Sequence, residues 1–136
     1  MKIGPILTRI EGQCPSLVSV LPAQALQALT DIDLQTPSVY VHIEEEITEG
    51  SELDLYTSQR VEYHVSVITV ARNYDRDTTE EELDDVRTEL FAALLGWQPD
   101  VNSEPCIHLG GRIVSISAQL IWWRDTWATA SLRRQA

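Results

Sequence analysis

The spacing of apolar residues predicts two helices in this chain. In the second half, apolar side chains recur at helical spacing at Leu83, Val86, Leu90, Leu94 and Leu95. Thr79 precedes Glu82 by three residues, which is the capping-box pattern of a helix start, and Gly96 is typical of a helix end. A shorter amphipathic helix is predicted to open at Pro5, because proline is tolerated in a first helical turn.

Alternating apolar and polar residues predict strands on both sides of the longer helix. The apolar period becomes two from Ser38, and a long strand is predicted from Gln59 to about Arg72. Two further apolar runs, 106–109 and 112–124, are separated by two glycines. Because a Gly-Gly pair between apolar runs is typical of a hairpin, Gly110 and Gly111 are predicted to form the turn.

These elements predict an α+β fold of one domain, residues 1–136. The main elements follow the order α-β-β-α-β-β. That order favours a single antiparallel sheet, mostly of four strands, with the two main helices packed on one face. Residues 17–20 are a candidate short edge strand, and Pro22 opens a helical turn or two after them.

The charge balance excludes one class of function. The chain has 21 acidic and 10 basic residues, a formal net charge of −11, and an ordinary hydrophobic share of 43%. Sequence-specific DNA binding needs clustered basic residues over the phosphates, and none are clustered here. The cysteines Cys14 and Cys106 are far apart without metal or redox spacing, which suits a protein made in the cytosol.

The most acidic segment, residues 44–54, holds six acids and no base. It lacks the register of an EF-hand, so a calcium loop is not predicted. The simplest interpretation is a solvated connection between two strands. The alternative is a loop aimed into a channel, where its negative charge keeps DNA from binding.

The sequence contains no phosphate-binding glycine loop, nucleophile elbow or zinc-protease motif. Its three histidines, His42, His64 and His108, fall on predicted strands without diagnostic spacing. Carboxylates are so abundant that no single pair points to acid–base catalysis. We therefore expect no catalytic residue, no cofactor and no metal site.

Aromatic and basic residues predict contacts between subunits. Adjacent Trp122 and Trp123 must point to opposite faces of a regular strand, so a sheet covered on one face leaves one of them exposed. Large aromatics are enriched in subunit interfaces, and arginines at strand ends can meet a neighbour's acids. The residues expected at contacts with a neighbouring subunit or another protein of the same assembly are Trp97, Trp122, Trp123, Trp127, Arg60, Arg112, Arg124 and Arg133.

A series of short motifs carries a resemblance to a known family. They are Gln59-Arg60-Val61, Val70-Ala71-Arg72-Asn73, Asp77, Val86-Arg87, Leu95-Gly96-Trp97-Gln98-Pro99-Asp100, Gly110-Gly111-Arg112, Trp122-Trp123-Arg124-Asp125 and Leu132-Arg133. Through them the segment from Gln59 to Arg134 resembles the tail terminator proteins of long-tailed bacteriophages. The N-terminal half matches more loosely, and Trp127 stands where the family pattern has Phe.

The resemblance implies a structural protein of the virion tail, not an enzyme. It implies a ring, expected to be a homo-hexamer, that caps the tail tube protein and meets a head–tail connector or stopper protein. Such a ring is assembled in the host cytoplasm and lies at the head–tail junction. Genomic DNA passes through it without sequence-specific binding, and no membrane takes part. The acids expected to face this lumen are Glu44, Glu45, Glu46, Glu49, Glu52 and Asp54.

Two other classes of function remain open at this stage. An acidic module could mimic DNA and block a nucleic-acid enzyme, which predicts acids along one face of a monomer or dimer. A small metal-dependent hydrolase predicts a pocket where histidine and glutamate side chains converge.

Overall fold

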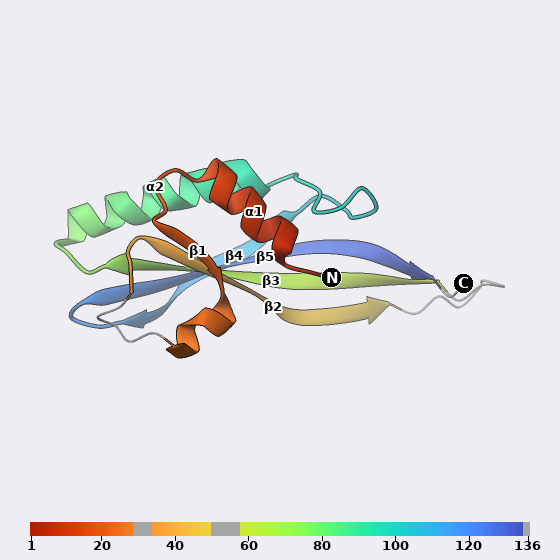
Figure 1. Cartoon of the computed structure of the whole chain (residues 1–136), viewed down its shortest axis with the longest axis horizontal. Helices are drawn as coiled ribbons and strands as arrows, with labels where there is room; N and C mark the ends of the chain where they lie inside the picture. The colour runs from red at the N-terminus through yellow and green to blue at the C-terminus, as the bar shows by residue number, and fades with distance from the viewer. Residues whose placement is uncertain (29–33, 50–57, 135–136) are drawn as a thin grey trace.

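The computed structural model describes residues 1–28, 34–49 and 58–134. Its elements are α1 (Gly4–Gln13), β1 (Ser19–Pro22), the 3-10 helix η1 (Ala23–Ala28), β2 (Ser38–Glu49), β3 (Ser58–Arg72), α2 (Arg76–Leu94), β4 (Ile107–Ile116) and β5 (Leu120–Arg134). One sheet runs along the length of the molecule, with α1 and α2 on one side and η1 on the other (Figure 1).

The sheet is mixed and has five strands in the order β1-β2-β3-β5-β4. The predicted four-stranded antiparallel sheet, with the element order α-β-β-α-β-β, is therefore wrong. The extra strand is β1, which pairs in parallel with residues 38–41 of β2. Parallel neighbours need a crossover connection, and η1 lies in the connection between β1 and β2.

Apolar residues on the two faces of the sheet form two cores. The face under α1 and α2, called the α face, buries Ile6, Ile10, Val39, Val41, Val65, Val67, Val86, Leu90, Leu94 and Trp127. The opposite face, called the η1 face, buries Leu34, Tyr40, Val70 and Leu120, with Trp122 packed against them. The strand period of two explains this division, because alternate residues of β2 and β3 belong to different cores.

Helix α2 begins earlier than predicted. Asp75 is its N-cap, and the Asp75 carboxylate accepts hydrogen bonds from the backbone N–H and hydroxyl of Thr78 at 2.9 and 2.8 Å. Thr79 lies inside the helix, where its hydroxyl accepts a hydrogen bond from the backbone N–H of Tyr74, so the predicted capping box is wrong. The predicted end is confirmed, because Gly96 takes a left-handed φ of +78° just after the helix.

The glycine pair lies inside β4, so the predicted Gly-Gly hairpin is wrong. Residues 117–119 connect β4 to β5, and the Ser117 hydroxyl accepts hydrogen bonds from two backbone N–H groups of this connection at 3.2 and 3.0 Å. Gly111 lies opposite Asp125 in the ladder. A Cβ on Gly111 would lie 2.5 Å from Asp125 Oδ1, so this glycine permits a close approach of the Asp125 side chain.

The first half of the acidic segment belongs to β2, so a solvated connection does not describe residues 44–49. Arginines of β3, which pairs with β2, and of β5, the strand beyond β3, stabilise this acidic strand. The ion pairs are Glu44–Arg124 at 2.9 Å, Glu46–Arg133 at 2.7 Å and Glu49–Arg60 at 3.2 Å. The ends of β2, β3 and β5 extend past the helices in Figure 1, and we call this three-stranded extension the arm.

Candidate interaction surfaces

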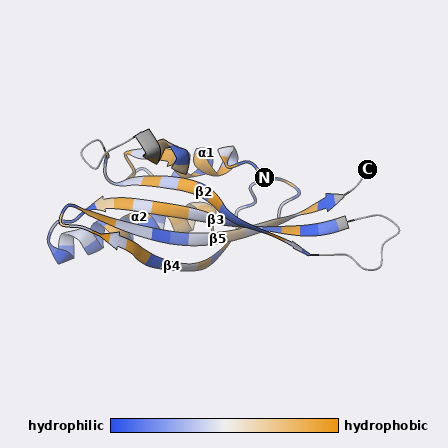
Figure 2. Cartoon of the chain, turned by 90° about the horizontal axis from the view of Figure 1, so that it is seen from below, coloured by the Kyte–Doolittle hydropathy of each residue, from blue (hydrophilic) through white to orange (hydrophobic). Residues whose placement is uncertain are grey.

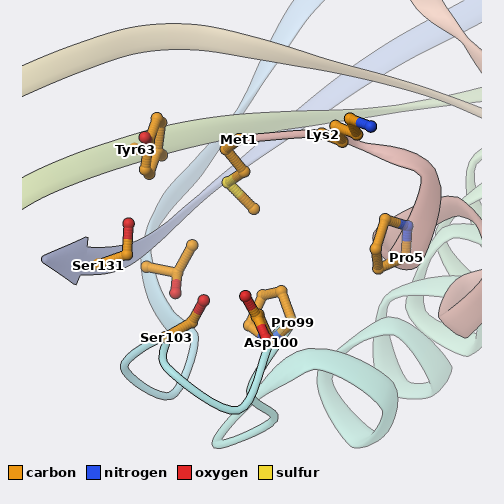
Figure 3. A pocket seen from close by; sticks show the side chains of 9 residues that line it. Met1, Lys2, Pro5, Tyr63, Pro99, Asp100, Ser103 and Ser131 are labelled. Atoms are coloured by element: carbon orange, nitrogen blue, oxygen red, sulfur yellow. The ribbon is translucent and has the colours of Figure 1, made fainter. Parts of the chain in front are cut away.

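A hollow of about 390 Å³ lies between the N-terminus and the α face of the arm. Figure 3 shows Met1, Lys2 and Pro5 on one side of this hollow, with Tyr63 and Asp100 among the other lining residues. Its lining includes one lysine and one aspartate, with no histidine or cysteine. Across the residues that the structure describes, no three His, Cys, Asp or Glu side chains gather to hold a metal ion.

In the same described ranges, no helix is long and apolar enough to cross a membrane.

The outermost strand, β4, exposes more apolar side chains than any other element. Ile107 and Ile116 have 53% and 60% of their surface exposed. The other exposed aliphatic residues of this strand are Leu109, Ile113 and Val114. Among the described strands β4 pairs with β5 alone, and in Figure 2 it forms one margin of the sheet. We call this exposed margin, residues 107–116, the β4 rim.

Three of the four arginines expected at subunit contacts form ion pairs within the chain. Arg60 donates two hydrogen bonds to the Glu104 carboxylate, at 2.7 and 2.9 Å, besides its contact with Glu49. Arg124 and Arg133 hold glutamates of β2, as described above. The fourth, Arg112, is exposed on the β4 rim and lies opposite Arg124.

The Arg60 network lowers the pKa of two of its carboxylates, Glu62 and Glu104. A hydrogen bond from His64 at 2.7 Å, followed by one from Arg60, lowers the pKa of Glu62 below its ordinary value of 4.5. Arg60 likewise lowers the pKa of Glu104. A general acid needs a raised pKa, so these groups are suited to charge pairing rather than to proton transfer.

The four tryptophans occupy different environments. Trp127 is 1% exposed and its ring packs edge-on against Phe91, so its side chain lies in the interior. Trp122 and Trp123 lie on opposite faces, as predicted: Trp122 joins the η1-face core, and the Arg87 guanidinium lies 4.6 Å from the Trp123 ring centre. Trp97 is half-buried against the α-face core. None of the four is fully exposed.

A buried carboxylate that the sequence analysis did not single out lies beside these rings. Asp125 is fully buried, accepts hydrogen bonds from Arg87 at 2.9 and 3.1 Å, and lies 2.9 Å from His108 Nε2. Arg87 comes from α2 and His108 from β4, so the cluster joins three elements. Its sequence signal is a lone aspartate between Trp123 and Trp127 on the buried face of a strand.

The expected lumen acids divide into three groups. Glu44, Glu46 and Glu49 are paired with arginines, as given above. Glu45 is more exposed, and its carboxylate lies 3.5 Å from His64 Nδ1. Glu52 and Asp54 lie outside the described residues.

Comparison with known proteins identifies the family. A search of the curated proteins finds no match to this sequence. The sequence pattern of the family described as phage tail terminator protein matches residues 1–136, which is the whole chain. The chain therefore belongs to the phage tail terminator family, a family of structural proteins of the phage tail.

Proposed function

We propose that this protein caps the phage tail tube, ends its polymerisation and forms part of the head–tail joining interface. The family match over the whole chain is the observation that carries this proposal. Capping requires a surface that binds the growing end and a second surface for the head-side connector. The protein acts in this proposal by shape and charge, without catalysing a reaction.

The form proposed for the active assembly is a homo-hexameric ring around the DNA channel. A ring of identical subunits needs two different surfaces on each subunit, one that meets each neighbour. The exposed β4 rim on one margin of the sheet and the acidic β2 on the other side support this arrangement.

The negative charge of the subunit suits passage of DNA. A net charge of −11 repels a polyanion, so DNA sliding through such a ring would meet little attraction from its wall. We propose that acids of the segment 44–54 face this channel.

Deletion of the gene in the phage or particle that encodes it tests the function. We expect tails of uncontrolled length, or heads without attached tails, when the particles are viewed by electron microscopy. Restoring the wild-type gene from a plasmid should restore uniform tails. Tails of normal length joined to heads in the deletion strain would contradict the proposal.

A further inference from the structure

We infer that the β4 rim of one protomer binds the outer edge of β2 in a second copy of this chain. This inference rests on the proposed ring and assigns the two surfaces that meet at its subunit boundary. The contact is head-to-tail, since each protomer offers its β4 rim to one neighbour and its β2 edge to the other.

The β4 rim needs a covering partner. Its five exposed aliphatic residues gather on one edge strand and lie on both faces of the sheet, since Ile107 shares the face of Ala128 and Ile113 that of Trp123. In the part of the chain that the structure describes, no strand pairs with the outer side of β4. An edge strand of this kind is a template for association with another chain.

Along its acidic half, the outer edge of β2 pairs with no strand among the described residues. β1 pairs only with residues 38–41, so from His42 to Glu49 no described strand lies on that side. This free stretch is long enough to lie along most of β4, and it exposes Ile47, an aliphatic residue 38% exposed, among the glutamates.

The charges of the two edges are complementary. Arg112 is the only Lys, Arg, Asp or Glu residue of β4, whereas the free half of β2 carries four glutamates. Among the described residues, Glu44, Glu46 and Glu49 form ion pairs with arginines, whereas Glu45 does not. In the sheet register, Glu45 lies opposite His64 of β3. Arg112 lies opposite Arg124 of β5, which lies opposite Ile68 of β3. His64 and Ile68 are separated by an even number of positions along β3.

That even spacing places Glu45 and Arg112 on the same face of the sheet, the η1 face. If one sheet continues into the next around a ring, the η1 faces of neighbours stay on the same side. Arg112 of one copy can then meet Glu45 of the next across the boundary. In this arrangement Glu45 lies between subunits, and the proposed channel role is left to the other acids of the segment 44–54.

The same charges disfavour the symmetric alternatives. A two-fold contact between two β4 rims would bring the two copies of Arg112 together, and one between two β2 edges would oppose two rows of glutamates. β-bulges interrupt β4 near Gly110 and Val114, and β2 near Glu44, so a continuous backbone ladder between copies is not expected. The aliphatic side chains of the rim and the charge pair carry the contact.

Cysteine cross-linking tests which edges meet. Ser115→Cys places a thiol on the β4 rim and His42→Cys places one on the β2 edge. Register partners Trp122 and Ser66 put both positions on the η1 face, and antiparallel edges with Arg112 opposite Glu45 bring them level with each other. We expect a short bis-maleimide to cross-link the mixture of the two full-length variants into dimers and to leave each variant alone uncross-linked. The matched control replaces His42→Cys by Thr88→Cys, an exposed position on α2, and should give no cross-link.

The native cysteines should not react with the bis-maleimide in this experiment. Cys14 and Cys106 are 2% and 4% exposed, and burial raises the pKa of each thiol to about 11. The wild-type chain treated with the same reagent measures any residual background.

Charge reversal gives a second measurement. Arg112→Glu should weaken self-association about tenfold, measured by light scattering across a concentration series, because an attractive pair becomes repulsive. Arg76→Glu makes the same charge change at the exposed start of α2 and should leave association unchanged.

Three outcomes would overturn the inference. They are self-cross-linking of Ser115→Cys alone, an oligomer without the mixed cross-link, and a chain that stays monomeric at every concentration. None of these outcomes would decide the capping function. The deletion experiment tests that function separately, because it measures tail length and not which edges meet.

Discussion

At the residue scale, one glycine makes room for a buried carboxylate. A Cβ on Gly111 would lie 2.5 Å from Asp125 Oδ1 and 3.0 Å from the Trp123 ring, while a Cβ on Gly110 would meet nothing within 4 Å. Asp125 cannot move aside freely because Arg87 holds both of its oxygens. Gly111→Ala should therefore lower the free energy of unfolding by about 1–3 kcal/mol, measured by urea denaturation.

Gly110→Ala is the matched control, with an expected change within about 0.5 kcal/mol. Equal losses in the two variants would show that strand flexibility, and not the approach of Asp125, sets the requirement for glycine.

The Asp125 cluster is also expected to stabilise the fold through its charge. Asp125→Asn keeps the shape but leaves the partly buried Arg87 without its counter-ion, which should cost about 2–3 kcal/mol of unfolding free energy. Asp85→Asn on the exposed side of α2 removes the same charge and should change stability by less than about 0.5 kcal/mol. Urea denaturation of both variants checks the difference, and a neutral Asp125→Asn would contradict it.

At the element scale, the predictable helices and strands were those specified by residues close together in the sequence. α1, β3 and the end of α2 follow from proline, alternation and Gly96, each of which acts within a few residues. The turn between β4 and β5 was not predictable from Gly-Gly, because the glycine at position 111 makes room for the Asp125 side chain, which is distant in sequence.

The surfaces were less predictable than the elements. Arg60, Arg124 and Arg133 looked available to neighbours in the sequence, yet strand register brings each one to a glutamate of the same chain. The β4 rim could not be recognised either, since only the strand order shows that this aliphatic strand lies at a margin. Pairing across strands is a long-range property, and alternation within one strand does not contain it.

The arm should lose part of its stability in acid. Glu62 and Glu104 have pKa values below 4.5 in the folded protein, so their pairing with Arg60 and His64 stabilises the fold above that pH. The contribution is lost as the pH falls through the folded-state values. Arg60→Gln should therefore be less stable than wild type at pH 7, by about 1 kcal/mol or less for such exposed groups.

The stability difference should shrink toward zero as the pH is lowered from 5 to about 3, measured by urea denaturation at each pH. Arg76→Gln, which removes a more exposed pair, should show a smaller difference at every pH. A difference between Arg60→Gln and wild type that stays constant down to pH 3 would contradict the assignment.

At the scale of the whole molecule, the acids of the segment 44–54 are expected to ease DNA passage. Glu52→Gln with Asp54→Asn removes two charges of this segment and keeps the carboxylates of Glu44, Glu46 and Glu49 that pair with arginines. Particles carrying this variant should assemble normally and eject DNA more slowly, measured by dye release from single particles. The control, Asp84→Asn with Asp85→Asn, removes the same charge from α2 and should leave the ejection rate unchanged. Equal ejection rates for wild type, the Glu52/Asp54 variant and this control would contradict the channel role.

The net charge also makes an assembly of these subunits sensitive to salt. Each copy carries −11, so copies repel one another over a distance set by the ionic atmosphere. That distance falls from about 30 Å at 0.01 M salt to about 10 Å at 0.1 M. Self-association should therefore tighten by about tenfold as salt rises over this range. Salt screens the repulsion between the charged copies, whereas it does not screen the burial of apolar surface at the β4 rim.

Light scattering at the two salt concentrations measures this effect, with Arg112→Glu as the companion variant because it adds two negative charges and should respond to salt more steeply. An acidic DNA mimic would behave in the opposite way, since its complex with a basic enzyme is held by attraction and dissociates as salt rises. Association that weakens with salt would show that charge pairs, and not the aliphatic margin of β4, hold the copies together.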